Sequence, residues 1–126
     1  MESISIDSYQ HEDFSAVVEL LKRANMFYPP ADTEEVYAQQ LKKDPESMIV
    51  ARQGNAVVGF VMAVYGPWAS TINHLVVDPA YRGRDLGKRL MDAAEKTLFD
   101  KGTAQIRLFV KPGNEEVITF YKHIGY

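Results

Sequence analysis

The sequence predicts an α/β fold in which helices flank a mixed β-sheet, and three observations support this class. Strand-like and helix-like patterns alternate along all 126 residues, without repeats or low-complexity tracts. Three strand-like runs follow one another between residues 48 and 77, as in an antiparallel meander. A strand–helix–strand crossover comes next, and such a unit makes its two strands parallel. With 46% hydrophobic residues the chain can bury a core, so we expect a single domain over residues 1–126.

The first elements are a strand and two helices. Alternation of Ile4 and Ile6 with polar neighbours predicts the strand. Apolar residues at helical spacing over residues 14–21 predict a helix, and the pair Pro29-Pro30 breaks it. Thr33 is a good N-cap for a second, shorter helix, whose apolar positions are Val36, Tyr37 and Leu41.

The remaining elements form the sheet and its crossover. We expect strands over residues 48–51, 57–65 and 71–77, separated by the turn signals Gly54-Asn55 and Gly66-Pro67. A helix over 86–99, a strand over 105–110 and a helix over 115–124 follow. The resulting order, β-α-α-β-β-β-α-β-α, predicts three layers of helix, sheet and helix, with the strands near residues 75 and 107 parallel.

Composition excludes several classes of function. The formal net charge is −3, so neither nucleic acid nor an anionic membrane is an expected partner. The chain has no cysteine, which excludes disulfides and thiolate nucleophiles, and His11 and His123 are too far apart in the sequence to suggest a metal cluster. The N-terminus lacks the basic start and apolar run of a secretory signal, and we expect a cytoplasmic protein.

The most informative segment is the corner between the strand at 71–77 and the helix at 86–99. Asp78-Pro79 ends the strand, because proline has no N–H for the ladder, and Gly83 and Gly87 lie on either side of the corner. The first turn of a helix has unpaired backbone N–H groups that favour an anion. Four cations, Arg82, Arg84, Lys88 and Arg89, crowd this helix start. They favour an anion site; for Lys88 and Arg89 alone a solvated helix face explains them equally well.

A second segment, residues 114–126, predicts the final helix. Asn114 is a good N-cap and two glutamates suit the helix dipole, while Val117, Phe120, Tyr121 and Ile124 fall on one face. Gly125 then ends the helix. On periodicity alone, Tyr121 is a core aromatic residue.

Together these two segments resemble the Gcn5-related N-acetyltransferase (GNAT) superfamily. Its motif, Arg/Gln-x-x-Gly-x-Gly/Ala after a strand ending in Val-Asp-Pro, is similar to Arg82, Gly83, Arg84, Asp85, Leu86 and Gly87. The resemblance implies that backbone amides from Gly83 to Lys88 hold the pyrophosphate of acetyl-CoA (coenzyme A). It also implies that main-chain groups of Val76 and Val77 bind the pantetheine arm. Asp85 departs from the family pattern, which has glycine there.

The C-terminal motif extends the resemblance. Asn-x-x-x-Ile-x-Phe-Tyr-x-x-x-Gly-Tyr is similar to the family's motif near its C-terminus, where the tyrosine lies near the coenzyme sulfur. Tyr121 is therefore expected to donate a proton to the departing thiolate, a role that suits a phenol with a pKa of about 10. The resemblance also implies that Asn114 contacts the pantetheine or its phosphate.

The general base and the acceptor are less constrained. His74 is the candidate base, because it lies on the strand beside the expected cofactor site and can accept a proton near neutrality; alternatively it is a structural histidine of the sheet. The resemblance implies that the two N-terminal helices and their connection, residues 25–32, cover the acceptor site. Phe27, Tyr28 and the acids Asp32, Glu34 and Glu35 could meet an amine there, although the two glutamates also suit a helix N-terminus.

Two functions remain open at this point. The first is an N-acetyltransferase that acts on a primary amine of a small molecule or a peptide. The second is a catalytically inactive acyl-CoA-binding or protein-interaction module, because the Asp85 carboxylate could cap the helix and occupy the anion site. The family usually adds one or two strands after the Gly-Tyr motif, so the chain is either naturally minimal or cut. An uncovered sheet edge would favour a homodimer.

Overall fold

A five-stranded mixed sheet organises the protein. The computed structural model describes residues 3–83, 85–108, 119, 121 and 122. Within these residues the strands lie in the order of the sequence: β1 (Ile4–Ser8), β2 (Met48–Gln53), β3 (Ala56–Val64), β4 (Ser70–Val77) and β5 (Ile106–Leu108). Neighbours from β1 to β4 are antiparallel, whereas β5 pairs parallel with β4. The predicted meander and crossover are confirmed.

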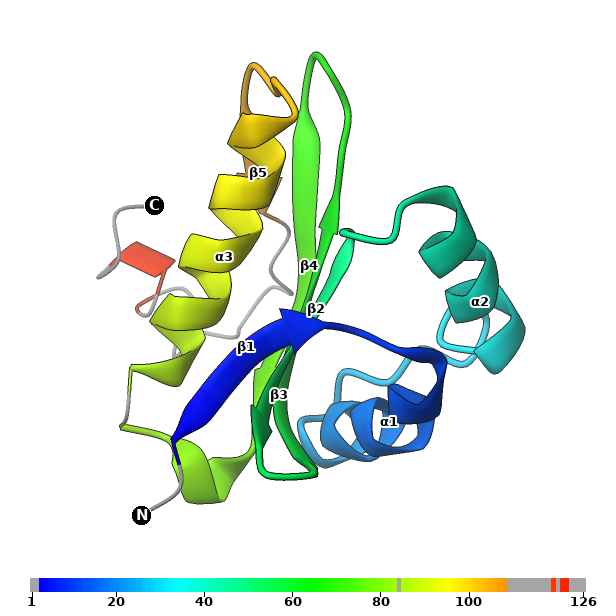
Figure 1. Ribbon diagram of the computed structural model, residues 1–126, viewed down its shortest axis with the longest axis vertical. Helices are drawn as coiled ribbons and strands as arrows, with labels where there is room; N and C mark the ends of the chain where they lie inside the picture. Colours follow the sequence, from blue (N-terminus) through cyan, green and yellow to red (C-terminus); the bar gives the residue numbers. More distant parts are fainter. Residues whose placement is uncertain (1–2, 84, 109–118, 120, 123–126) are drawn as a thin grey trace.

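Helices cover both faces of this sheet. Helices α1 (Phe14–Arg23) and α2 (Glu34–Lys43) lie on one side and α3 (Leu86–Asp100) on the other, which gives the predicted three layers (Figure 1). Two 3₁₀ turns, η1 (His11–Asp13) and η2 (Pro79–Tyr81), precede α1 and α3. Thr33 caps α2 as expected, since its hydroxyl oxygen accepts a hydrogen bond of 3.1 Å from the Val36 N–H.

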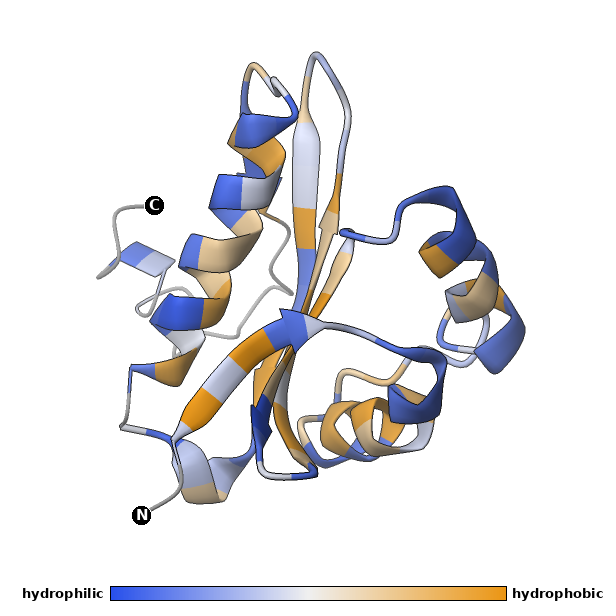
Figure 2. Ribbon diagram, in the orientation of Figure 1, coloured by the Kyte–Doolittle hydropathy of each residue, from blue (hydrophilic) through white to orange (hydrophobic). Residues whose placement is uncertain are grey.

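The α3 face of the sheet holds the first hydrophobic cluster. The predicted apolar stripe of α3 is fully buried against β2, β3 and β4, and it consists of Leu86, Leu90, Ala94 and Leu98. Figure 2 shows hydrophobic positions of α3 alternating with hydrophilic ones along the helix. Gly59 of β3 permits the close approach, because a Cβ built there would lie 2.9 Å from Leu90 Cδ1.

The other face holds an aromatic cluster. Tyr37 of α2 lies at its centre, with ring centroids 5.3 Å from Phe14, 5.9 Å from Tyr9 and 6.1 Å from Phe60. Through these four rings, α1 and α2 pack against β3 on this face of the sheet. Tyr37 is therefore held rigidly, and its hydroxyl donates a hydrogen bond to the carboxylate of Asp32.

Part of the expected fold lies outside the described residues. The helix expected over 115–124 is described only at Thr119, Tyr121 and Lys122, which are helical, and the strand expected over 105–110 is described to Leu108. Among the helices that the structure describes, none combines the length and the apolar character needed to cross a bilayer.

Candidate active site

The β4–α3 corner is where the sequence predicts an anion-binding turn. β4 ends at Val77, and the Asp78 carboxylate accepts a hydrogen bond of 3.0 Å from the Ala80 N–H, which starts η2. Gly83 then adopts φ +82°, in the left-handed region that favours glycine. Arg84 lies outside the described residues. α3 begins immediately afterwards at Leu86.

Asp85 does not occupy this site. It is the residue that precedes α3 and has φ +54°, yet its side chain makes no capping hydrogen bond in the described structure. Only its backbone carbonyl takes part, accepting a bond of 3.0 Å from the Arg89 N–H. The expectation that the carboxylate could cap the helix is wrong for this structure, because the Asp85 side chain accepts no hydrogen bond from the first turn of α3.

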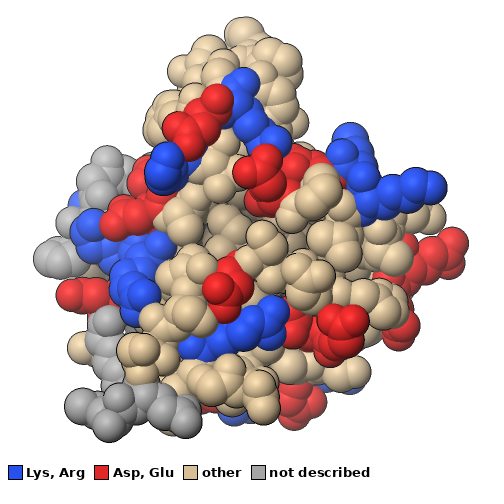
Figure 3. All heavy atoms as spheres, in the orientation of Figure 1, with Lys and Arg blue, Asp and Glu red and all other residues tan. Residues whose placement is uncertain are grey.

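Two of the four cations expected at the corner, Lys88 and Arg89, have partners within the protein. Lys88 Nζ lies 2.9 Å from Asp92 Oδ2 one turn along α3, and this hydrogen bond raises the lysine pKa. Arg89 reaches back to donate a hydrogen bond of 2.9 Å to the Ile4 carbonyl oxygen. Lys88 is thus paired on α3 itself and Arg89 reaches β1, while Arg82 is exposed at the corner. Figure 3 shows basic and acidic side chains interspersed over the face in view.

β4 carries the residues expected to meet the pantetheine. Val76 pairs with Phe60 and Val77 with Gly59 on the β3 side. On the other side, the described pairing with β5 runs from Ser70 to Ile72. Val76 and Val77 therefore lie beyond the described β5 pairs, at the end of β4 that leads into the corner.

His74 lies in an irregular part of β4. Between the pairs Phe60–Val76 and Met62–Asn73, β4 has one residue more than β3, so the strand bulges. His74 adopts φ +58° in this bulge, a conformation uncommon for residues other than glycine. Its side chain is 23% exposed.

The imidazole of His74 is paired with a buried carboxylate. Its Nε2 atom lies 3.0 Å from both Oδ1 and Oδ2 of Asp32, in the connection between α1 and α2. Asp32 is only 3% exposed. Its oxygens also accept hydrogen bonds of 2.7 Å from the Tyr37 hydroxyl and 2.8 Å from the Tyr28 N–H. Burial, and then this bond to Asp32, raise the pKa of Tyr37, which therefore remains a donor.

This arrangement corrects the role expected of Asp32. Asp32 is not an open acid that awaits an amine, because its carboxylate is buried and its oxygens are already used. The sequence contains no signal that joins residue 32 to residue 74. Asp32 directly precedes the N-cap Thr33, where an acidic residue is common and needs no further explanation. Only the packing of α2 against the sheet brings its carboxylate to His74.

Tyr121 belongs to the opposite face. It packs against the cluster under α3, and burial raises the pKa of its hydroxyl. Asn114 lies outside the described residues. The two candidate catalytic side chains thus come from the two sides of the sheet, because His74 contacts Asp32 from the α1–α2 side.

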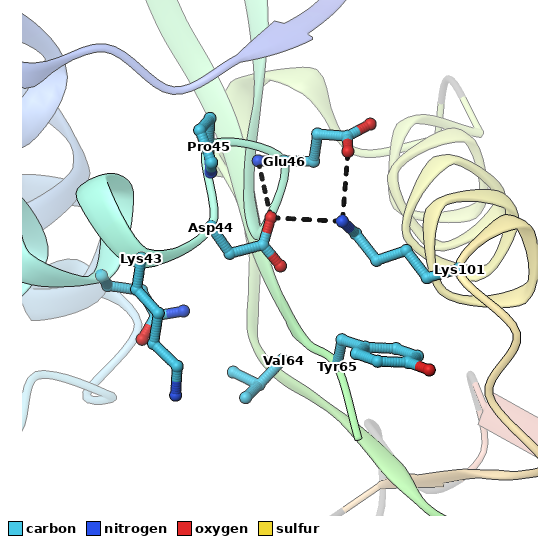
Figure 4. Close-up of a pocket in the computed structure, with 8 residues that line it drawn as sticks. Lys43, Asp44, Pro45, Glu46, Val64, Tyr65 and Lys101 are labelled. Carbon is cyan, nitrogen blue, oxygen red and sulfur yellow. Dashed lines mark hydrogen bonds and ion pairs between the residues drawn. The ribbon is translucent and has the colours of Figure 1, made fainter. Parts of the chain in front are cut away.

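A separate hollow lies between the C-terminal ends of α2 and α3 (Figure 4). Lys101 Nζ lies 3.1 Å from Glu46 Oε1 and 3.5 Å from Asp44 Oδ1 across its mouth. Figure 4 shows the dashed contacts that join these three side chains above Val64 and Tyr65. None of the expected site residues lines it, so this hollow is distinct from the candidate active site.

Comparison with known proteins identifies the class. The model of the acetyltransferase (GNAT) family matches residues 14–126. This chain belongs to that family, whose members use acetyl-CoA, and the resemblance found in the sequence is confirmed.

Individual relatives agree with this assignment. The chain is 32% identical over 123 residues to an acetyltransferase of Sodalis glossinidius, covering 98% of this chain and 87% of that protein. It is similar to the crystal structure of Ard1 from Thermoplasma volcanium, with 27% identity, a TM-score of 0.84 and coverage of 97% and 81%. The PaiA N-acetyltransferase of Thermoplasma acidophilum in complex with coenzyme A shares the fold, with 20% identity, a TM-score of 0.85 and coverage of 98% and 89%.

Proposed function

We propose that the protein transfers the acetyl group of acetyl-CoA to a primary amine of a small molecule or a peptide, by direct attack of the amine. The observation that carries the proposal is the pairing of His74 with the buried Asp32, on the strand that leads into the β4–α3 corner. The proposed proton acceptor and the proposed anion-binding turn would then lie close together, on β4 and on the corner that follows it, and the reaction needs both groups.

The corner supplies the binding groups. When bound, acetyl-CoA contributes a thioester that an amine can attack and a thiolate that leaves. We assign its pyrophosphate to backbone N–H groups from Gly83 to Lys88, with Arg82 as the nearby described cation, and its pantetheine to the main chain of Val76 and Val77. The uncapped first turn of α3 and the left-handed Gly83 support this assignment.

We assign the two proton transfers of the reaction to two side chains. An alkylammonium group has a pKa of about 10.4 and must lose a proton before it attacks; we assign this proton to His74. Tyr121 gives its hydroxyl proton to the departing thiolate, and the raised pKa of this phenol supports the role because it stays protonated. Since the two residues come from opposite sides of the sheet, the reacting thioester would lie between them, along β4.

Thermal unfolding with acetyl-CoA tests the binding half of the proposal. A ligand at 1,000 times its dissociation constant adds about 4 kcal/mol to the free energy of unfolding. For a domain of this size the midpoint should rise by more than ~5 °C. Arg82→Ala should reduce the rise, whereas Lys96→Ala, an exposed cation in the last turns of α3, should leave it unchanged. No rise at millimolar acetyl-CoA would contradict the assigned cofactor.

An acetylation screen tests the catalytic half. Release of the free thiol from acetyl-CoA is followed with an alkylamine, an amino sugar, a polyamine, a lysine-containing peptide and a peptide with a free α-amino group. Turnover with any of these amines, lost in His74→Gln, is the expected result. Tight binding of acetyl-CoA without turnover on the whole panel would favour the inactive acyl-CoA-binding module instead.

A further inference from the structure

We propose that Asp32 is a positioning residue, which holds the imidazole of His74 so that its Nδ1 atom carries the lone pair that takes the proton of the amine. This inference rests on the proposed function, which assigns the base to His74. It adds a residue from the α1–α2 connection to a site otherwise built from β4, the corner and the C-terminal segment.

The contacts of the ring define which nitrogen is protonated. A neutral imidazole has one N–H and one lone pair, and an ionised carboxylate can only accept hydrogen bonds. Because Nε2 lies 3.0 Å from both carboxylate oxygens of Asp32, Nε2 carries the hydrogen. Nδ1 has no hydrogen-bond partner among the residues that the structure describes. The lone pair is therefore on Nδ1, at a side chain that is 23% exposed.

Asp32 is itself held in place. Its Oδ2 accepts the Tyr28 N–H at 2.8 Å, and its Oδ1 accepts the Tyr37 hydroxyl at 2.7 Å. The Tyr37 ring cannot swing away, because it is 1% exposed and stacks on Phe60 at an interplanar angle of 18°. A carboxylate bound by a backbone group and by a packed phenol cannot rotate to follow the histidine. It instead fixes the orientation of the ring.

The backbone of His74 gives an independent reason to connect the pair with function. A residue other than glycine is strained at φ +58°, and such strain persists where the surrounding structure imposes it. The extra residue of β4 turns the His74 side chain toward the α1–α2 connection. A histidine that merely filled a regular sheet position would need neither the bulge nor the buried carboxylate.

The ¹⁵N chemical shifts of the His74 ring, measured by NMR on the free protein at pH 8, test the orientation directly. His74→Gln identifies the signals. We expect a protonated Nε2 and an unprotonated Nδ1 in the wild type. In Asp32→Asn the single preference should be lost and the shifts should move toward a mixture of tautomers, because the amide presents a donor and an acceptor to Nε2. Hydrogen on Nδ1 in the wild type would overturn the inference.

Kinetics with the amine that is acetylated fastest in the panel tests the consequence. Asp32→Asn should lower kcat by roughly 10–100-fold, with the KM for acetyl-CoA unchanged within about twofold. In the His74→Gln background the same substitution should have no further effect on kcat, because a positioning residue acts only through the histidine. Additive losses in the double variant would overturn the inference.

Asp13→Asn is the matched control. Asp13 is a second buried carboxylate on this side of the protein, but it pairs with Arg52 at 2.6 Å and belongs to η1. Its loss should reduce stability without moving kcat or the His74 shifts. Loss of activity in His74→Gln with full activity in Asp32→Asn would overturn the inference and leave the proposed base intact. Full activity in His74→Gln would overturn the base assignment, and this inference with it.

Discussion

The hydroxyl of Tyr121 is the group whose proton the proposed reaction uses last. Burial raises its pKa above the ordinary value of about 10, because the buried phenolate would lose its hydration. A phenol with a raised pKa stays protonated to higher pH than a free tyrosine. The Tyr121 hydroxyl can thus donate its proton throughout the neutral pH range. We expect it to lose this proton to the solvent only in strongly alkaline solution.

Tyr121→Phe removes this donor with little change of volume. We expect kcat to fall by roughly 10²-fold or more, which is typical for the loss of a general acid. The thermal shift with acetyl-CoA should remain, since the ring still packs under α3. A pH series on the wild type should show no loss of kcat through an acid below about pH 10. Unchanged turnover in the variant would reject the role of Tyr121.

Asp85 places a negative charge next to the proposed pyrophosphate site. Its carboxylate stands at the N-terminus of α3 without capping it, so a bound pyrophosphate would meet a negative charge beside the amides that hold it. Asp85→Asn removes the charge and keeps a side chain that tolerates φ +54°. Affinity for coenzyme A, measured by calorimetry, should rise by roughly 2–5-fold, corresponding to about 0.4–1 kcal/mol.

A matched substitution separates charge from strain. Asp85→Ala also removes the charge but leaves a residue that is poorly suited to a left-handed conformation, so its affinity should rise similarly while its unfolding midpoint falls. Equal affinity in the wild type and in both variants would show that the carboxylate does not repel the coenzyme.

At the scale of elements, α3 is held against the sheet by a contact that only glycine allows. A Cβ at Gly59 would lie 2.9 Å from Leu90 Cδ1 and 3.3 Å from the Val76 carbonyl oxygen. Leu90 is fully buried, so a shift of its side chain would disturb the close packing around it. Since α3 begins at the proposed anion-binding turn, this contact also determines how closely the start of α3 approaches the sheet.

Gly59→Ala should therefore destabilise the protein by about 1–3 kcal/mol, as overpacking does elsewhere. Leu90→Val removes the crowded methyl position, so the double variant should lose less stability than the sum of the single variants. Urea unfolding of the four proteins measures this. Strict additivity would show that the two positions do not press on one another.

The ion pair between η1 and β2 joins α1 to the sheet. Burial alone would raise the pKa of Asp13, but the hydrogen bonds from Arg52 and from the Gln10 N–H, together with the Arg52 charge, outweigh it and hold the pKa below its ordinary value. A carboxyl whose pKa is lower in the folded state stabilises the protein above its unfolded pKa of about 3.9. This contribution is lost as the pH falls through the folded pKa.

Asp13→Asn should lower the free energy of unfolding by about 1–3 kcal/mol at pH 7. It should also flatten the fall of stability with pH below about pH 4, because the group that takes up the proton is gone. Denaturant unfolding between pH 2 and pH 7 compares the variant with the wild type. Parallel stability curves over this range would contradict the linkage.

At the scale of the whole molecule, two hydrophobic clusters share a single sheet. Leu98 lies in the cluster under α3 and Leu20 in the cluster under α1, and both are fully buried. Because each cluster includes residues of β2, β3 and β4, loss of either one should undo the strands that support the other. We therefore propose that residues 1–126 unfold as a single cooperative domain.

Leu98→Ala and Leu20→Ala test this cooperativity. Each should lower the free energy of unfolding by about 2–5 kcal/mol, with an unchanged m-value and coincident transitions by fluorescence and circular dichroism. A second transition in either variant would show that the two faces unfold separately.

Light scattering of the wild type tests the homodimer, which stays a prediction.

The fold was largely predictable because its signals are local. The buried stripe of α3, the cap at Thr33 and the turn at Gly54 each follow from residues a few positions apart. The corner after β4 was predictable for the same reason, since Asp78-Pro79 and Gly83 specify their own backbone. The ion pair between Lys88 and Asp92 is also local. The sequence pattern alone, however, does not show whether Lys88 pairs with Asp92 or binds an anion.

Contiguous motifs and short-range periodicity were enough to predict the family, the order of the described elements and the segment proposed to bind the pyrophosphate. The surroundings of His74, in contrast, follow only from how distant segments pack together. The bulge that tilts this residue and the carboxylate of Asp32 that pairs with it come from segments 42 positions apart in the chain. Their meeting depends on how α2 packs over the sheet, and the side-chain packing that brings them together leaves no pattern in the sequence.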